Sequence, residues 1–278
     1  MPSVIIPAHD EEAGIERTLR SVLADGIPEL EIVVVVNGSS DRTAEIARGV
    51  DPAIEVIETA TPGKTNALNL GEARLRSFPR VFLDADIVLH PGTLRSILDA
   101  CDDDHPIVSP RPVFDLDGCG VGMRLFMQAN RYNHYFGRGA PNGSGCFVLS
   151  ESGRGRWGDF PDVVADDGFV HGHFRPGEGT TVPGTGATVG PPRDLGSMVT
   201  VRARVRRGRL ELERRFPELM GNHESQVGGA LKRMLVRPWT WPALAVYGWV
   251  RIKERHLAKA QIASGETGWG RDDSARTG

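Results

Sequence analysis

Two aspartates separated by one residue, Asp84 and Asp86, are the residues whose types and spacing suggest chemistry most directly. They follow a short apolar run, Arg80 to Leu83, which predicts a buried strand. Alternate residues of a strand share a face, so we expect the two carboxylates to point into one site. Such carboxylates repel each other unless a cation lies between them, and Mg²⁺ or Mn²⁺ commonly joins carboxylates to phosphates. The pair indicates a metal–phosphate site, and the alternative is that both aspartates only cap the next segment.

The segments around this pair must form a sheet that presents it. The run from Glu31 to Val36 is apolar almost throughout, which is typical of a strand buried on both faces. Strand and helix patterns alternate before the pair, which predicts an α/β fold with a parallel sheet that binds ligands at its carboxyl edge. In the helix next to the pair, the residues expected to be buried are Ala67, Leu68, Leu70 and Ala73. The predicted order is strand 4–7, helix 11–23, strand 31–36, helix 42–49, strand 55–58, helix 64–75 and strand 80–83.

The second half of the chain has a less regular pattern. A helix is predicted over 118–135, with Met123, Phe126 and Met127 in the core. A glycine-rich turn enters a strand over 143–149, loops and short strands follow over 172–192, and a basic helix is predicted over 197–212. The residues from 265 onward are predicted to form a flexible tail.

Composition limits the class of protein. The 278 residues are 40% hydrophobic and 25% charged with a net charge of −3, which fits a globular protein and argues against a general nucleic-acid binder. Three cysteines without metal-like spacing fit a reducing cytosol. No secretion signal or membrane-spanning run is expected, so we predict a cytoplasmic protein, with peripheral contact at the inner face of the membrane left open.

The loop after the first strand excludes two common phosphate sites. It reads Pro7 to Glu12 without glycine, whereas dinucleotide dehydrogenases require G-x-G-x-x-G at this point. The sequence also has no G-x-x-x-x-G-K-[ST] loop. A bound phosphate must therefore be met by a metal and by basic side chains.

Four segments in the same order resemble glycosyltransferase family 2: Val4 to Glu12, Val36 to Thr43, Gly63 to Asn69, and Asp84 to Asp86. A looser resemblance continues to about Arg209. It implies the GT-A fold, which is an α/β, Rossmann-like, mostly parallel sheet flanked by helices. It also implies metal-dependent, inverting transfer of a sugar from a nucleoside diphosphate sugar to a hydroxyl of a glycolipid, a polysaccharide precursor or another saccharide, or a small molecule.

The resemblance also implies roles for residues on the donor side. Asn37 stands where the family often has an aspartate facing the base, and an amide can still pair with a pyrimidine. We expect a UDP-sugar donor, with a GDP-sugar as the alternative. Lys64 would pair with phosphate oxygens, unless it is only an exposed lysine at a helix start. Asp84 would contact ribose and metal-bound water, and Asp86 would bind Mn²⁺ or Mg²⁺ directly. The other donor-pocket residues implied are Pro7, Ala8, His9, Glu11, Ser39 and Ala85.

Asp166 and Asp167 match the family's acidic pair, whose second member is the catalytic base. A sugar hydroxyl is a poor nucleophile, and a carboxylate within hydrogen-bond reach can take its proton during attack. The resemblance thus implies Asp167 as base and Asp166 as its orienting neighbour. The alternative is that both cap a helix beginning near Gly168.

Many processive family members carry a Q-x-x-R-W motif after the base, and it is absent here, which favours single sugar additions. A basic run, Val201 to Arg209, stands in its place, and Arg202, Arg206 and Arg209 share one helix face. We expect Arg202 and Arg206 to close over the donor and the rest to be a solvated face. His171 and His173 could complete the metal site or be polar surface.

The predicted organisation is a catalytic domain over 1–215 with a nucleotide-binding half (1–100) and an acceptor-binding half (101–215), a helical extension (216–264) and a tail (265–278). Aromatic and basic residues cluster between Trp239 and Lys259, which suits a membrane surface, packing on the catalytic domain or a homodimer contact. The alternative function is a catalytically inactive sugar-nucleotide-binding protein with a regulatory or scaffold role. A nucleotidyltransferase would need a glycine-rich basic loop after the first strand, which is absent.

Overall fold

The computed structural model describes residues 1–132, 145–222 and 233–264, and the chain forms two compact units. The first unit comprises Met1–Val113, Pro141–Asp162 and His173–Val189, and the second Phe114–Ala140, Val163–Gly172 and Gly190–Gly278. The units interleave along the chain, so the linear division into 1–100, 101–215 and 216–264 stays a prediction. The predicted tail and the start of the glycine-rich turn, at 143 and 144, lie outside the described residues.

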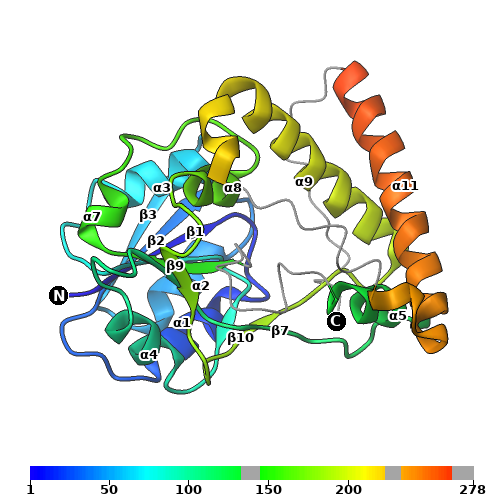
Figure 1. Ribbon diagram of the computed structural model, residues 1–278. Coiled ribbons are helices and arrows are strands. Elements are labelled where there is room, and N and C mark those ends of the chain that lie inside the picture. Colours follow the sequence, from blue (N-terminus) through cyan, green and yellow to red (C-terminus); the bar gives the residue numbers. More distant parts are fainter. Residues whose placement is uncertain (133–144, 223–232, 265–278) are drawn as a thin grey trace. The chain divides into compact units, whose positions relative to one another are not determined.

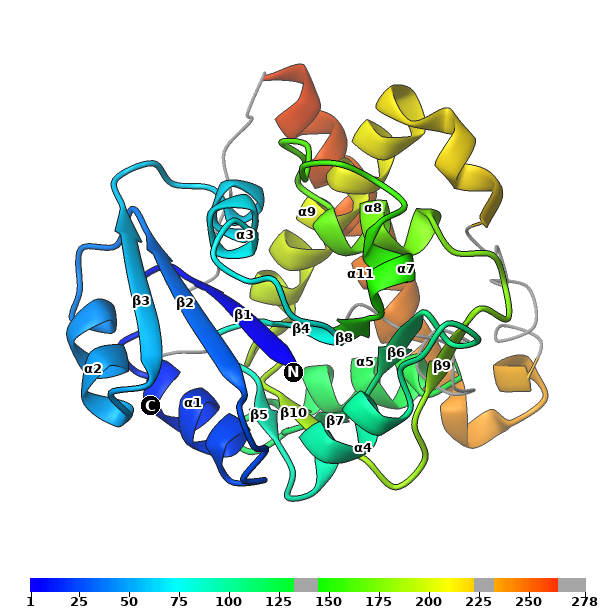
Figure 2. The same cartoon turned by 90° about the vertical axis from the view of Figure 1, so that its left-hand side faces the viewer.

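A seven-stranded, mostly parallel sheet organises the first unit, with the strand order β3-β2-β1-β4-β8-β6-β9. Its strands β1, β2 and β3 lie side by side in Figures 1 and 2. Strands β3, β2, β1 and β4 are parallel, β8 runs antiparallel to both β4 and β6, and β9 is parallel to β6. The parallel half confirms the predicted alternation of strands and helices. The strands are β1 (Ser3–Ala8), β2 (Glu31–Asn37), β3 (Ile54–Thr59), β4 (Arg80–Leu83), β6 (Ile107–Ser109), β8 (Cys146–Leu149) and β9 (Gly179–Thr181).

Helices cover both faces of this sheet, because successive strand residues point to opposite sides. Val4 and Ile6 of β1 share a core with Ile15 and Leu19 of α1. On the other face, α3 packs so closely that a Cβ added at Gly71 would lie 3.0 Å from the Ile5 side chain. Figure 2 shows α3 on one side of β1 and β2 and α1 on the other. The helices are α1 (Ile15–Leu23), α2 (Thr43–Val50), α3 (Lys64–Glu72), α4 (Thr93–Asp99) and α7 (Glu151–Arg154).

Two sequence predictions about these helices were wrong. Leu70 is 37% exposed and Ala73 is exposed, because Gly71, with no side chain, occupies the face of α3 that meets the sheet. Helix α1 begins at Ile15 rather than Glu11, since the chain first makes a turn in which Asp10 has a φ of 48°. A second, three-stranded sheet has the order β5-β10-β7 and lies outside the predicted set: β5 (Val88–Leu89), β7 (Pro112–Phe114) and β10 (Ala187–Val189).

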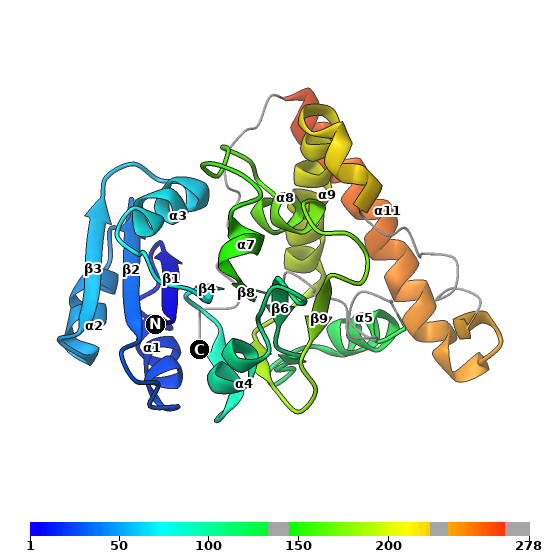
Figure 3. The ribbon, with the colours of Figure 1, turned by 60° about the vertical axis from the view of Figure 1, so that its left-hand side comes forward.

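The second unit is helical in the residues described. Helix α11 lies along α9, as Figures 1 and 3 both show, and also packs on α5. Its core contains Met123, Phe126 and Met127 of α5, as predicted, together with Val250 of α11. The predicted basic helix is confirmed as α9. The elements are α5 (Val121–Asn130), α8 (Asp166–Gly172), α9 (Leu195–Arg215), the 3₁₀ helices η1 (Pro217–Asn222) and η2 (Pro238–Thr240), and α11 (Trp241–Ala263).

Candidate active site at the carboxyl edge of the sheet

The two aspartates of the first unit lie on a turn directly after β4. The strand ends at Leu83, and the backbone N–H of Ile87 donates to the Asp84 carbonyl at 3.2 Å. The sequence had suggested that strand alternation orients the two carboxylates. That prediction was wrong, because both aspartates lie beyond the end of the strand. Ala85 between them is 3% exposed, whereas Asp86 is exposed. The turn is thus anchored at its centre and presents a carboxylate to solvent.

Three neighbouring elements hold this turn. The backbone N–H of Asp84 donates to the Gly145 carbonyl at 2.7 Å, just before β8. The hydroxyl of Thr18, on α1 and fully buried, donates to the Ala85 carbonyl at 2.7 Å. The Lys64 ammonium, at the first residue of α3, lies 2.7 Å from Asp84 Oδ1. This ion pair places Lys64 beside the acidic turn, and its predicted contact with phosphate oxygens stays a prediction.

The loop after β1 lies against the loop after β2. Pro7 and Ala8 are buried at the end of β1. The His9 Nδ1 atom lies 2.6 Å from the Asn37 carbonyl oxygen, the Asp10 N–H donates to Ser39 Oγ at 3.0 Å, and the buried Glu11 donates its N–H to Thr43 Oγ1 at 2.7 Å. These bonds bring the donor-side residues predicted on the two loops to one edge of the sheet.

Asn37 connects three segments. Its side chain is buried, with 4% of the residue exposed, and its Nδ2 donates to the Ala8 carbonyl at 2.8 Å. Its Oδ1 accepts from the backbone N–H of Gly63 at 3.0 Å, one residue before Lys64. Both ends of the amide thus bind backbone, and this geometry favours positioning of the α3 start over direct contact with a base.

The carboxylates fit a divalent cation that takes part of its coordination from a ligand. Among residues 1–132, 145–222 and 233–264, no group of three or more His, Cys, Asp or Glu side chains could by itself hold a metal ion. Mg²⁺, however, is usually bound by one or two carboxylates with phosphate oxygens and water. Asp86 makes no hydrogen bond or ion pair with the described residues, so its carboxylate is available, whereas Asp84 is engaged by Lys64.

In the second unit, Asp166 and Asp167 form the first turn of α8. Asp166 is 5% exposed, and Asp167 is half-buried. A Cβ added at Gly208 of α9 would lie 2.8 Å from the Ala165 side chain, so this glycine allows α9 to approach the start of α8 closely. The helix begins at Asp166 rather than near Gly168, so the pair belongs to its first turn.

Two of the remaining predicted residues, Arg202 and His173, have structural partners. Arg202 Nε lies 3.1 Å from Glu254 Oε2 of α11, and that glutamate is 1% exposed. The ion pair of Arg202 with Glu254 favours a role for Arg202 in helix packing. Closure of Arg202 and of the half-buried Arg206 over the donor stays a prediction. His173 stacks on Trp157 with ring centroids 4.9 Å apart, and His171 lies in the last turn of α8. Neither histidine belongs to a metal-binding group among the described residues.

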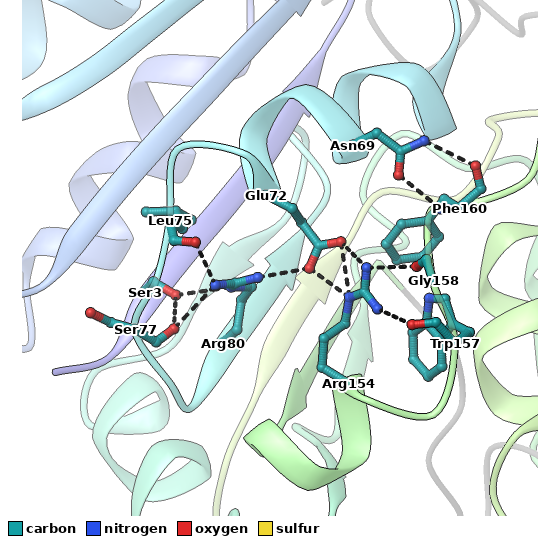
Figure 4. Close-up of polar contacts among 10 residues, drawn as sticks. All are labelled: Ser3, Asn69, Glu72, Leu75, Ser77, Arg80, Arg154, Trp157, Gly158 and Phe160. Carbon is teal, nitrogen blue, oxygen red and sulfur yellow. Dashed lines mark hydrogen bonds and ion pairs between the residues drawn. The ribbon is translucent and has the colours of Figure 1, made fainter.

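One buried network in the first unit was not predicted (Figure 4). The Glu72 carboxylate of α3 accepts a hydrogen bond from Arg80 Nη1 of β4 at 2.8 Å and another from Arg154 Nε of α7 at 2.7 Å. It also accepts from Arg154 Nη2. Beside it, Asn69 exchanges two hydrogen bonds with the Phe160 backbone, at 2.8 and 3.0 Å. These contacts fix α3, whose first residue is Lys64. The one sign of these contacts in the sequence is Arg80, an arginine within a run predicted to be a buried strand.

The three cysteines, Cys101, Cys119 and Cys146, are buried free thiols. Burial, with a smaller contribution from the charges of Asp102 and Asp103, raises the pKa of Cys101 to about 12. Burial also raises the pKa of Cys146 far above its ordinary value, with a further contribution from the negative charge of Asp84. Neutral, buried thiols are poor nucleophiles, so none is a candidate for chemistry at this site.

Comparison with known proteins gives a consistent assignment. The model of "Glycosyl transferase family 2" matches residues 3–150, which include β1 to β4 and the acidic turn. The uncharacterized glycosyltransferase EpsJ of Bacillus subtilis (strain 168) is 28% identical over 121 residues, which are 42% of this chain and 33% of that protein. The chain therefore spans a third of that relative's length.

Two solved structures share the fold. The mannosyltransferase PcManGT from Pyrobaculum calidifontis, in complex with GDP-Man and Mn²⁺, gives a TM-score of 0.58 at 20% identity, covering 95% of this chain and 79% of that one. Glucosyl-3-phosphoglycerate synthase from Mycobacterium tuberculosis, in complex with Mg²⁺ and UDP, gives 0.54 at 20% identity, covering 82% of each chain. The likeness confirms the predicted GT-A fold.

Proposed function

The chain belongs to glycosyltransferase family 2, and on that premise we propose that it transfers a sugar from a nucleoside diphosphate sugar to an acceptor hydroxyl, with a divalent metal ion and inversion at the anomeric carbon. The observation that carries the proposal is the acidic turn after β4. There an ammonium lies 2.7 Å from Asp84, and the carboxylate of Asp86 is exposed beside it. This combination suits a diphosphate, whose oxygens can take both the cation of Lys64 and a metal held by Asp86.

On the donor side, Lys64 would exchange part of its contact with Asp84 for phosphate oxygens. When bound, Mn²⁺ or Mg²⁺ would neutralise the charge that develops on the departing diphosphate. The edge formed by Ala8, His9 and Ser39 would line the nucleoside. We propose a UDP-sugar, with a GDP-sugar as the alternative. Both neighbouring structures named above hold a guanosine or uridine diphosphate compound with a divalent metal, which supports this class of donor.

For the transfer step we propose Asp167 as the general base. The acceptor hydroxyl would give its proton to this carboxylate while its oxygen bonds to C1 of the sugar and the bond from C1 to the diphosphate oxygen breaks. Attack on the face opposite the leaving group inverts the anomeric centre. Asp166 is buried in the same helical turn and would orient its neighbour. The acceptor would be a glycolipid, a polysaccharide precursor or a small molecule, with one sugar added at a time.

The donor site can be tested by thermal shift with nucleoside diphosphates, with and without Mn²⁺. A ligand at about a hundred times its Kd stabilises the fold by about 2.7 kcal/mol, which raises the Tm by roughly 5–10 °C in a chain of this size. Asp86→Ala should lose the Mn²⁺-dependent part of the shift and keep the melting point of the free protein. Asp104→Ala, at another exposed aspartate, is the matched control. An unchanged shift in Asp86→Ala would contradict the metal assignment.

Catalysis requires a separate test. Asp167→Asn should keep donor affinity within a few-fold and lower turnover about 10²-fold or more, the usual effect of removing a positioned base. Asp166→Asn should be the milder change, and the opposite order would move the base by one residue. If the wild-type protein binds UDP or GDP with Mn²⁺ but neither hydrolyses nor transfers any sugar from a donor panel, the non-catalytic sugar-nucleotide-binding alternative is favoured.

A further inference from the structure

Large apolar side chains are exposed in one region of the second unit. Trp239 is 70% exposed, Trp241 56% and Trp249 45%. Three aliphatic residues of the same region are exposed by more than half, and we call these six residues the tryptophan face: Leu235, Val236, Trp239, Trp241, Trp249 and Ile252. Soluble proteins rarely expose several large apolar residues together without a binding role.

Helix α11 has two distinct faces. Its inner face, at Ala243, Val250 and Ala258, is buried against the other helices of the unit. Trp241, Trp249 and Ile252 recur at intervals of eight and three residues, which places them together on the opposite side of the helix. The bulky side chains are therefore not part of the core that holds the helix in place.

Ion pairs and hydrogen bonds fix this orientation. Glu254, 1% exposed on the inner face, pairs with Arg202 of α9 at 3.1 Å and with Arg251 at 2.9 Å. The turn that precedes α11 is closed by the buried hydroxyl of Thr240, whose oxygen lies 2.7 Å from the carbonyl oxygens of both Met234 and Arg237. The tryptophan face is thus carried by a hydrogen-bonded turn and by a helix that forms an ion pair with α9.

The charge of this region is one-sided. Between residues 233 and 264 the chain has one acidic residue, Glu254, which is the buried ion-pair partner just described. The basic residues there are Arg233, Arg237, Arg251, Lys253, Arg255 and Lys259, although the whole chain has a net charge of −3. The Lys253 ammonium lies 5.9 Å from the centre of the Trp249 ring, so cations and indoles occupy the same surface.

We propose that the tryptophan face docks on an anionic lipid surface. Indole rings favour the depth of the lipid headgroups, and lysine and arginine are attracted to anionic lipid nearby. No helix of residues 1–132, 145–222 and 233–264 is both long and apolar enough to span a bilayer. The contact proposed is that of a surface helix with the headgroup region. A second copy of this chain is a poorer occupant, because its own basic surface would repel the first. The proposal rests on this surface alone and does not depend on the proposed reaction.

Co-sedimentation with vesicles tests the docking. Wild-type protein should bind vesicles of 30% phosphatidylglycerol in phosphatidylcholine at low salt, and should bind pure phosphatidylcholine at least about tenfold more weakly. Raising the salt to 1 M, where the Debye length is about 3 Å, should release most of the protein. The triple variant Trp239→Ser, Trp241→Ser, Trp249→Ser should bind anionic vesicles at least about tenfold more weakly. The control combines Leu70→Ser, Val113→Ser and Val205→Ser, which are exposed by 37–47%, and should bind like the wild type.

A charge variant provides a second test, independent of any effect of the serines on folding. Lys253→Gln with Lys259→Gln should weaken binding about 25-fold, roughly fivefold per cation, whereas Arg17→Gln with Arg76→Gln should leave it unchanged. The proposal is overturned if wild-type protein stays in the supernatant with anionic vesicles at low salt. It is also overturned if the serine variant, shown to be folded by its melting curve, binds as well as the wild type. Light scattering that finds a dimer abolished by the serines, without vesicle binding, would assign the face to a second copy.

Discussion

Gly145 is the residue whose substitution should most directly disturb the acidic turn. Its φ is +81°, and a Cβ added there would lie 2.7 Å from Ile87 Cγ1 and 3.1 Å from Asp84 Oδ2. A left-handed backbone costs a non-glycine residue roughly 1–2 kcal/mol. Forcing a methyl group into a packed site adds about 1–3 kcal/mol. Gly145→Ala should therefore lower the free energy of unfolding by about 2–5 kcal/mol and displace the Asp84 carboxylate.

Gly184 provides a matched control, because its φ is +79° and nothing lies within 4 Å of an added Cβ. Gly184→Ala should lower the free energy of unfolding only by the cost of the left-handed backbone, about 1–2 kcal/mol. Urea unfolding of both variants measures the difference, and calorimetry with UDP and Mn²⁺ should find weaker binding only for Gly145→Ala. If the two variants lose equal stability and bind UDP equally well, Gly145 does not support the acidic turn as we argue.

Further predictions concern single side chains. Lys64→Met should weaken Mn²⁺-dependent binding of UDP about tenfold or more in calorimetry, since an ammonium beside the diphosphate is lost; unchanged affinity would make it a structural lysine. Asn37→Asp should lower the free energy of unfolding by about 1–3 kcal/mol, because a carboxylate cannot donate to the Ala8 carbonyl; a more stable variant in urea would refute this. Glu72→Gln should lower the free energy of unfolding by about 3–5 kcal/mol, because the two buried guanidinium groups of Arg80 and Arg154 lose their counter-charge. Cys101, with its pKa raised to about 12 by burial, should react with a disulfide reagent at pH 8 only after unfolding in guanidinium, as followed by absorbance.

The parallel half of the fold was predictable because its signals are local. The run Glu31–Val36 is apolar over a full strand, and the glycine, proline and polar residues between the segments end each element. The acidic turn and Lys64 could be placed at one sheet edge from these elements alone. The same reasoning could not show that Asn37 turns its amide toward backbone, since that depends on where the Gly63 N–H lies after folding.

The elements missed in the second half are short and are held by contacts distant in sequence. Strand β6 has three residues, and its partner β8 lies about forty residues further along the chain. The Glu72 network joins three elements, and none of its members stands in a recognisable spacing with the others. Periodicity within a window carries no information about such pairs.

The region around α11 shows why composition alone leaves a surface undecided. Its tryptophans and cations suit a membrane face, an interior contact or a dimer equally well, as long as the inner side of the helix is unknown. The fully buried residues of the helix are Ala243, Val250, Glu254 and Ala258, and Tyr247 and Leu257 also pack on the core of the unit. The inner side is thus already filled by other residues, and Trp241 and Trp249 lie on the opposite side of the helix, where they are exposed.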